Sequence, residues 1–306
     1  MERLRKLLLE RCPDLELRTD EPMSKHTTFR IGGPAALMAL PESVSEAKMV
    51  LRAARELGVE PFFLGNGSNL LVADEGYPGF VVKLTGEFEE VRATARRPGE
   101  TAHLLAGGAV LLSQLSRQAQ ERGLTGLEFA QGIPGSVGGA VTMNAGAYGG
   151  EISQVLLQVA VLDPDGSENL LSVAGCDLSY RHSRFSKGDL LICQAVFALE
   201  PDDPEEIAAR MKDFAQRRRE KQPLEYPSAG STFKRPPGRF AAALIDQCGL
   251  KGLAVGGAQV SEKHAGFVVN RGGATCGDVL KLVDQVKERV LRQTGVELEL
   301  EVKVLR

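Results

Sequence analysis

The chain has 306 residues, enough for about two domains, and 43% of them are hydrophobic and 25% charged, as in soluble globular proteins. The net charge of −3, the lack of tryptophan and an aromatic content of 5% argue against a nucleic-acid-binding surface. Such a surface needs clustered basic charge and aromatic stacking platforms. Glycine, with 34 residues, is enriched above its usual share of roughly 7%.

The first half of the chain is predicted to alternate helices and strands. After a short N-terminal helix, Ser43 and Glu46 form a capping box that opens a helix ending at Gly58. Strands are then predicted at 61–64, 80–84 and 91–108, a helix at 111–122, and several short strands at 155–199. This order favours an α/β or α+β core.

The last third of the chain begins at a predicted boundary near residue 201. Asp203 as the N-cap and Pro204 as the first helical residue predict a helix that runs to about residue 221. Apolar residues at helical spacing over 279–291 predict the final helix. Alternating apolar and charged residues over 296–304 predict a strand with one wet face.

The glycines gather in two segments. GNGSNLLV at 65–72 follows a predicted strand, where successive backbone N–H groups can hold an anion such as a diphosphate. A tight turn without a ligand is an equally good interpretation of this segment. Between residues 132 and 150 the glycines are denser than a structural loop needs, which indicates close backbone approach to a large cofactor.

Several common sites do not fit the sequence. The segment at 65–72 lacks the third glycine of GxGxxG, and the chain has no Gly-Lys dipeptide for a P-loop and no GxSxG nucleophile elbow. The four histidines lack the spacing of metal ligands, so no metal site is expected. Five cysteines without a CxxC, and apolar runs too short to span a bilayer, predict reduced thiols in a cytoplasmic protein.

Motifs spread over nearly the whole chain resemble one family. They are KHTTFRIGGP at 25–34, GNGSNLLV at 65–72, EFAQGIPGSVGGAVTMNAGAYGGEI at 128–152, SYRHSRF at 179–185, AGSTFKRP at 229–236 and KHAGFVVN at 263–270. In this order they resemble the UDP-N-acetylenolpyruvoylglucosamine reductase (MurB) family. The resemblance implies an FAD-dependent reductase of peptidoglycan precursor synthesis that reduces UDP-N-acetylglucosamine enolpyruvate with NADPH as co-substrate.

The resemblance also implies the fold and the division of labour. The fold would be α+β, with an FAD-binding domain of the vanillyl-alcohol-oxidase (PCMH) type at 1–200, made of two lobes divided near 85. A smaller α+β substrate-binding domain would occupy 201–306. Non-covalent FAD would be held by the two glycine segments, namely by Gly65, Asn66, Gly67, Ser68, Asn69, Gly132, Ile133, Pro134, Gly135, Ser136, Gly138, Gly139, Asn144 and Gly146.

The resemblance assigns catalysis to Arg181, Ser231 and Glu301, and substrate binding to Tyr180, Arg181, Ser231 and Lys234. A hydride reaching the enol ether builds negative charge toward the substrate carboxylate, which a cation such as Arg181 can stabilise. Ser231 matches the serine that donates the proton. Glu301 matches the family's catalytic glutamate, which would help to stabilise the enolic intermediate.

Each of these residues also has an interpretation without catalysis. Arg181 alone is more typical of a surface ion pair, and Ser231 of a turn after Gly230. Glu301 shares its predicted strand face with Glu297 and Glu299, so spacing alone indicates only a solvated face.

The sequence departs from the family at Gly266, where asparagine is common, at Leu300, where proline is common, and in a missing tyrosine-bearing loop after 179–185. Because it lacks this loop, the chain resembles the second, shorter subtype of the family.

Two other functions stay open. One is another FAD oxidoreductase of the PCMH superfamily that acts on an alcohol or a sugar. The other is a non-catalytic module that binds nucleotide phosphates. In every case we expect a small-molecule ligand, no nucleic acid, no membrane and a monomer.

Overall fold

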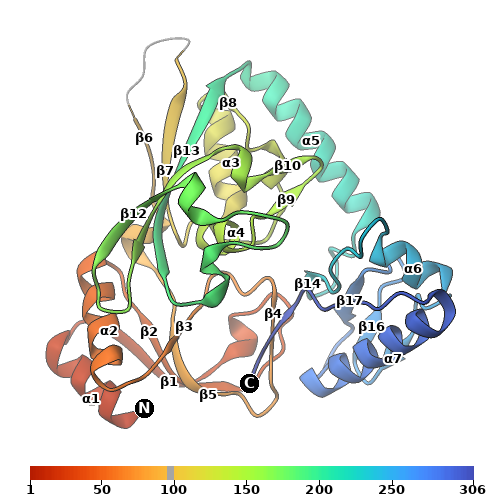
Figure 1. The fold of residues 1–306 in the computed structure, drawn as a ribbon, viewed down its shortest axis with the longest axis horizontal. Coiled ribbons are helices and arrows are strands. Elements are labelled where there is room, and N and C mark those ends of the chain that lie inside the picture. The colour runs from red at the N-terminus through yellow and green to blue at the C-terminus, as the bar shows by residue number, and fades with distance from the viewer. Residues whose placement is uncertain (95–99) are drawn as a thin grey trace. The chain divides into compact units, whose positions relative to one another are not determined.

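The computed structural model describes residues 1–94 and 100–306. They form two compact units, each assembled from separate stretches of the chain, which can be followed by colour in Figure 1. Unit 1 comprises Met1–Thr19, Leu37–Asn66 and Gly79–Gln216, and unit 2 comprises Asp20–Ala36, Gly67–Pro78 and Arg217–Arg306. The expected division into a cofactor domain at 1–200 and a substrate domain at 201–306 concerns function, and it stays a prediction.

One part of unit 1 contains most of a sheet with the strand order β1-β2-β5-β3, packed against two helices (Figure 1). Its elements are α1 (Glu2–Arg11), β1 (Glu16–Pro22), β2 (Pro34–Leu40), α2 (Val44–Glu56), β3 (Pro61–Phe63) and β5 (Tyr77–Val82). Ser43 caps α2 as predicted, since its Oγ accepts from the N–H of Glu46 at 3.3 Å. The Glu46 carboxylate accepts instead from the N–H of Glu42, so the predicted box is only half formed.

The other part of unit 1 is a sheet with the order β12-β11-β13-β7-β6, with β8 beside β13. The strand and helix predicted at 91–108 and 111–122 are confirmed outside residues 95–99, which lie beyond the described part of the chain. The elements are β6 (Val91–Ala93), β7 (Ala102–Gly107), α3 (Leu112–Glu121), β8 (Leu124–Thr125), α4 (Val137–Thr142), β9 (Gly146–Ala147), β10 (Gly150–Glu151), β11 (Leu156–Leu162), β12 (Glu168–Ser172) and β13 (Leu191–Pro201).

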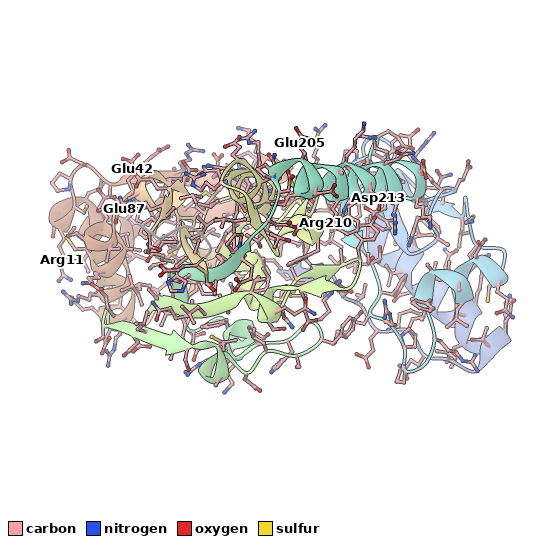
Figure 2. All side chains as sticks on the ribbon, turned by 90° about the horizontal axis from the view of Figure 1, so that it is seen from above. Arg11, Glu42, Glu87, Glu205, Arg210 and Asp213 are labelled. Carbon is pink, nitrogen blue, oxygen red and sulfur yellow. The ribbon has the colours of Figure 1, made fainter. Side chains whose placement is uncertain are left out.

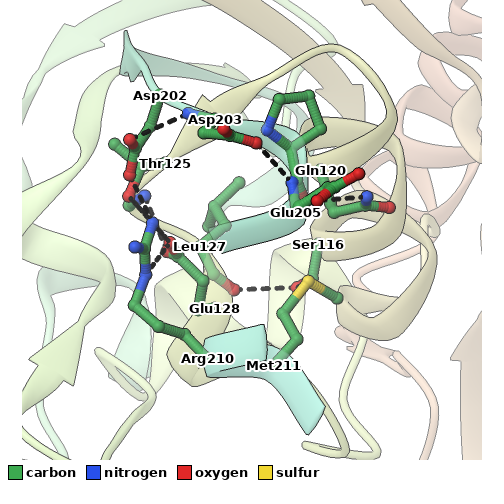
Figure 3. Close-up of polar contacts among 12 residues, drawn as sticks. Ser116, Gln120, Thr125, Leu127, Glu128, Asp202, Asp203, Glu205, Arg210 and Met211 are labelled. Atoms are coloured by element: carbon green, nitrogen blue, oxygen red, sulfur yellow. Dashed lines mark hydrogen bonds and ion pairs between the residues drawn. The ribbon is translucent and has the colours of Figure 1, made fainter. Parts of the chain in front are cut away.

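Helix α5 (Pro204–Lys221) begins and ends where the sequence predicts, and the Asp203 carboxylate accepts from the N–H of Glu205 at 2.8 Å. Figure 2 shows Glu205, Arg210 and Asp213 along this helix. Arg210 anchors its first half to unit 1 (Figure 3). Its guanidinium donates to the buried Glu128 carboxylate at 2.8 and 3.0 Å and to the Asp202 carboxylate at 2.5 Å.

Replacing Glu128 by Gln is expected to lower the free energy of unfolding near pH 7 by about 1.5–3 kcal/mol, the usual contribution of hydrogen bonds to a charged group. Burial alone would raise the pKa of Glu128, but hydrogen bonds from Thr125, Gly126 and Arg210 outweigh it and lower this pKa. The stabilisation from the Glu128 carboxylate is therefore fully present above the pKa that this carboxyl has in the unfolded chain. It disappears as the pH falls through the lower pKa of the folded state.

Urea unfolding from about pH 7 to about pH 3 measures this effect. The free energies of unfolding of the wild type and of Glu128→Gln should differ at neutral pH and become equal at acid pH. The control, Glu206→Gln, removes an equal charge from an exposed position of α5. A difference between wild type and Glu128→Gln that stays constant over this pH range would contradict the role of the charge.

Unit 2 contains a sheet with the order β14-β17-β16-β15, and its core is shared with α6 and α7. A separate pair joins β4 and β18 in parallel, with Lys303 opposite Leu70 and Leu305 opposite Val72. The elements are β4 (Leu70–Val72), β14 (Ser228–Ser231), α6 (Ala241–Gln247), β15 (Ala254–Val255), β16 (Ala258–Val260), β17 (Phe267–Asn270), α7 (Cys276–Thr294) and β18 (Lys303–Leu305). Short 3₁₀ helices lie at Met23–Lys25, Gly86–Glu89, Glu128–Ala130, Ile152–Gln154, Val173–Cys176 and Arg184–Lys187.

The strand predicted at 296–304 is mostly wrong. Only Lys303–Leu305 forms a strand, and Leu300 makes an isolated bridge to Phe233. The alternation of burial is nevertheless real, because Leu298 and Val302 are buried whereas Glu297 and Glu299 are exposed. An extended segment can alternate in this way without a partner strand along its length.

The thiols match the sequence expectation. All five cysteines are free, and only Cys248 is not fully buried. Burial raises the pKa of Cys193 to about 12 and that of Cys276 to about 11, which disfavours the reactive thiolate form at neutral pH. Among the described residues, no helix has the length and apolar character needed to cross a membrane.

Candidate active site

The first glycine loop begins where β3 ends. In unit 1, the Asn66 side-chain amide donates to the Pro134 carbonyl at 2.5 Å, which joins this loop to the second glycine segment. A Cβ on Gly65 would lie 2.5 Å from Oγ of Ser136, so only glycine fits without a shift. Within the described residues, the backbone N–H groups of Gly65 and Asn66 donate to no protein acceptor.

The loop continues in unit 2 with Gly67, whose φ is +60°. A Cβ on Gly67 would overlap the carbonyl oxygen of His26 and lie 2.9 Å from Cα of Thr27. The Gly67 carbonyl accepts from the N–H of Thr28 at 3.2 Å. The N–H groups of Gly67 and Ser68 find no acceptor in the part of the chain that the structure describes. Successive N–H donors of this kind suit an anionic ligand such as a diphosphate.

The second glycine segment has the same character. Gly135 and Ser136 are buried residues, and their N–H groups donate to no acceptor among residues 1–94 and 100–306. The Ser136 hydroxyl caps the short helix α4 by accepting from the N–H of Gly139 at 3.4 Å. Buried N–H groups normally have partners, so these donors fit a bound ligand better than a closed turn. Cofactor binding by the two segments stays a prediction, with which these N–H donors are compatible.

Tyr180 and Arg181 occupy a tight turn in unit 1, closed by reciprocal backbone bonds between Ser179 and His182 at 3.0 and 3.1 Å. Arg181 is half-buried, has a φ of +54° and lies 5.2 Å from the centroid of the Tyr180 ring. A non-glycine residue with positive φ costs energy and often marks a functional position.

The second glycine segment holds this turn in place. The buried Asn144 amide donates to the Ser179 carbonyl at 3.3 Å, and the Ser183 hydroxyl donates to the Thr142 carbonyl at 2.8 Å. In unit 1 the structure therefore brings together the predicted cofactor residue Asn144 and the segment that carries Arg181.

The segments that carry the remaining catalytic candidates, Ser231 and Glu301, lie side by side in unit 2. The N–H of Glu301 donates to the carbonyl of Thr232, next to Ser231, at 2.9 Å. The carbonyl of Glu301 accepts from the side-chain amide of Asn69 at 3.0 Å. The N–H and the carbonyl of Glu301 are thus both hydrogen-bonded. Glu301 is also half-buried, whereas Glu297 and Glu299 are exposed. These bonds distinguish Glu301 from its neighbours, which spacing alone could not do.

Lys234, predicted to bind substrate, pairs with the Glu299 carboxylate at 3.2 Å on an exposed part of unit 2. Its N–H donates to the Glu299 carbonyl at 2.9 Å, which continues the contact between the Ser231 segment and the C-terminal segment. An exposed ion pair of this kind contributes little to stability, so Lys234 can exchange Glu299 for another anion at small cost.

Sequence reasoning missed the role of Asp74, which lies just after β4. Its carboxylate accepts from the N–H groups of Cys276 and Gly277 at 2.7 and 3.0 Å, and so caps the start of α7 beside the N-cap residue Thr275. Asp74 and Cys276 are about 200 positions apart, so no local pattern could have indicated this contact.

Comparisons with known proteins agree with this geometry. Residues 35–169 match the model of an FAD binding domain, and residues 222–305 match the C-terminal domain of UDP-N-acetylenolpyruvoylglucosamine reductase. The first range contains the glycine segments, and the second contains Ser231, Lys234 and Glu301.

The chain is similar over nearly its whole length to known reductases. It is 49% identical to UDP-N-acetylenolpyruvoylglucosamine reductase of Agathobacter rectalis over 98% of this chain and 97% of that protein. It is 47% identical to the reductase of Syntrophomonas wolfei over 96% of each chain. The crystal structure of MurB from Thermus caldophilus superposes with a TM-score of 0.79 at 38% identity, covering 95% of this chain and 99% of that one.

The predicted α+β fold with an FAD-binding domain is thereby confirmed. The chain belongs to the UDP-N-acetylenolpyruvoylglucosamine reductase (MurB) family, FAD-dependent oxidoreductases of peptidoglycan precursor synthesis.

Proposed function

We propose that this chain reduces the enolpyruvyl group of UDP-N-acetylglucosamine enolpyruvate to give UDP-N-acetylmuramate, with FAD bound non-covalently and NADPH as the reductant. Family membership supports the substrate class. The observation that carries the chemistry is the double anchoring of Glu301, which backbone bonds hold beside the segment of Ser231. The protein would work as a cytoplasmic monomer.

The two glycine segments, 65–69 and 132–146, would hold FAD. In the part of the chain that the structure describes, the N–H groups of Gly65, Asn66, Gly135 and Ser136, all in unit 1, have no protein acceptor and would suit its diphosphate, and Asn144 of the same unit would contribute to the site. Bound FAD would supply the hydride-transfer chemistry that links NADPH to the methylene carbon of the enol ether.

Arg181 would bind the substrate carboxylate beside Tyr180. When the hydride reaches the methylene carbon, the electron pair of the double bond moves to the carbon that carries the carboxylate, and negative charge spreads onto its oxygens. A guanidinium already in place stabilises this charge without reorganisation. The positive φ of Arg181 agrees with a side chain held for function rather than for local stability.

Ser231 would then donate a proton from its Oγ to the carbon that received the electron pair, which completes the reduction. A serine hydroxyl is a weak acid, so it needs a neighbour that favours the transfer. Glu301 would serve this purpose by orienting the hydroxyl or a water beside it. Lys234 would contact the diphosphate of the sugar nucleotide, since its partner Glu299 is exposed.

We also propose that the chain is of the second, shorter subtype. The 3₁₀ helix Arg184–Lys187 ends at Gly188, whose φ is +79°, and β13 begins at Leu191. The shortness of this connection supports the proposal that the tyrosine-bearing loop of the first subtype is absent.

The test is spectroscopic. Purified protein should be yellow, and NADPH should bleach the flavin absorbance. Addition of the enolpyruvyl sugar nucleotide under anaerobic conditions should restore that absorbance, and NADPH consumption should require the sugar nucleotide. Rapid recovery with oxygen alone would indicate an oxidase acting on another alcohol or sugar. A colourless protein that cannot be reconstituted with FAD would indicate a non-catalytic binding module.

A further inference from the structure

Thr28 connects two parts of unit 2 that serve different ends of the proposed reaction. Its N–H donates to the carbonyl of Gly67, in the cofactor loop, at 3.2 Å. Its hydroxyl donates to the carbonyl of Ser228, at the start of β14, at 2.7 Å. The side chain is half-buried, where a short hydrogen bond is weakly screened by water. One residue thus contacts both the loop and the strand that ends at Ser231.

The bond to Ser228 lies at a place where β14 is irregular. Ser228 faces Val269 of β17 and Ser231 faces Phe267, so β14 carries one more residue than its partner between these pairs. This extra residue is a β-bulge, and Gly230 takes a φ of +74° within it. Bulges redirect the side chains that follow them. The direction of the Ser231 side chain therefore depends on how Ser228 is held.

Phe29, the residue after Thr28, is bonded to β17, the strand that pairs with β14. The carbonyl of Phe29 accepts from the side-chain amide of Asn270, at the end of β17, at 3.2 Å. Consecutive residues 28 and 29 are thus bonded to both strands around the bulge. On the far side of the bulge, Thr232 is bonded to Glu301, which in turn is bonded to Asn69 of the cofactor loop. The residues on both sides of the bulge are therefore connected by hydrogen bonds to residues 67–69, through Thr28 on one side and through Glu301 on the other.

We propose that Thr28 is a positioning residue, which sets the direction of the Ser231 hydroxyl relative to residues 67–69 of the cofactor loop by holding Ser228 and Gly67 together. This role rests on the proposed function of Ser231 as the proton donor. Thr28 acts through Ser228 and is not itself a catalytic residue. Its hydroxyl matters in the step that uses the Ser231 proton, whereas the transfer from NADPH does not need it.

The variant Thr28→Val removes the hydroxyl, preserves the shape of the side chain and keeps the N–H that bonds to Gly67. We expect the recovery of flavin absorbance with the sugar nucleotide to slow by about ten- to a hundred-fold, because a displacement of about 1 Å at a reacting group can cost that much. Bleaching by NADPH and the Kd for FAD should stay within about twofold of the wild type. Thr28→Ser, which retains a donor, should restore the lost rate.

The control is Thr294→Val in the same unit, which removes a hydroxyl that donates to the Val290 carbonyl at 2.8 Å near the end of α7. Thr294→Val should lose about as much free energy of unfolding as Thr28→Val. It should leave the rates of flavin bleaching by NADPH and of recovery with the sugar nucleotide unchanged. In apoprotein, amide hydrogen exchange over residues 228–232 should be faster in Thr28→Val than in the wild type or in Thr294→Val.

Three results would overturn the role of Thr28: an unchanged recovery step in Thr28→Val, equal slowing of both steps, or a Thr28→Ser variant as slow as Thr28→Val. Failure of the proposed function is distinguishable, because the wild type itself would then not recover its absorbance with the sugar nucleotide. The exchange experiment on apoprotein would still report whether Thr28 holds the bulge.

Discussion

Ser231→Ala should slow the recovery of flavin absorbance by the enolpyruvyl sugar nucleotide by about 10²- to 10⁴-fold, the usual contribution of a positioned general acid. Bleaching by NADPH should remain within about twofold of the wild type, because that step transfers a hydride and uses no proton from Ser231. The substitution removes one oxygen atom from a half-buried position and leaves the backbone bonds of β14 in place.

Stopped-flow absorbance under anaerobic conditions separates the two steps. Ser113→Ala, at an exposed position of α3, is the control and should change neither. Equal losses in both steps, or no loss in either, would remove Ser231 from the role of proton donor. A loss confined to the first step would assign the residue to the binding of NADPH.

Gly67→Ala is expected to have the largest effect on cofactor binding. At a φ of +60° any side chain costs about 1–2 kcal/mol, and here the added Cβ also overlaps backbone atoms of His26 and Thr27. Overpacking adds about 1–3 kcal/mol, since backbone cannot move aside like a flexible side chain. The loop must shift, and with it the N–H groups of Gly67 and Ser68. We expect FAD binding to weaken by about a hundred-fold, or about 2.8 kcal/mol.

Gly58→Ala is a matched control, because Gly58 has a φ of +64° and an added Cβ would meet no atom within 4 Å. Gly58→Ala should lower the free energy of unfolding only by the cost of a side chain at positive φ, about 1–2 kcal/mol, and should leave the affinity for FAD unchanged. Urea unfolding of apoprotein and titration with FAD measure the two effects. If Gly67→Ala and Gly58→Ala behaved alike in both measurements, close packing would not be the reason for glycine at position 67.

Elements whose ends depend on local chemistry were predictable from the sequence. The start of α2 depends on the Ser43 hydroxyl, and the start of α5 on the Asp203 carboxylate, each bonded to an N–H two or three residues away. The segment at 296–304 failed because alternation reports burial, whereas a strand needs a neighbour in register. Leu300 meets Phe233 for a single bridge, and only residues 303–305 find a continuous partner.

The candidate site was predictable as a set of residues but not as an arrangement. Motifs indicated Gly67, Ser231 and Glu301, yet the bonds that connect their segments join residues far apart in the chain. Thr28 lies inside a recognised motif, but its partner Ser228 is 200 positions away and only tertiary structure brings them together. Likewise, Glu297, Glu299 and Glu301 have the same spacing but differ in burial and in their backbone hydrogen bonds, which depend on tertiary structure.

The parallel pairing of β4 with β18 has a consequence for how the protein is made. During translation, Leu70–Val72 leave the ribosome long before Lys303–Leu305, so β4 waits as an apolar strand with unpaired backbone groups. Contacts between such distant segments form slowly, and an unpaired strand can associate with other chains in the meantime. The loop before β4 gains its final support only after the last strand is synthesised.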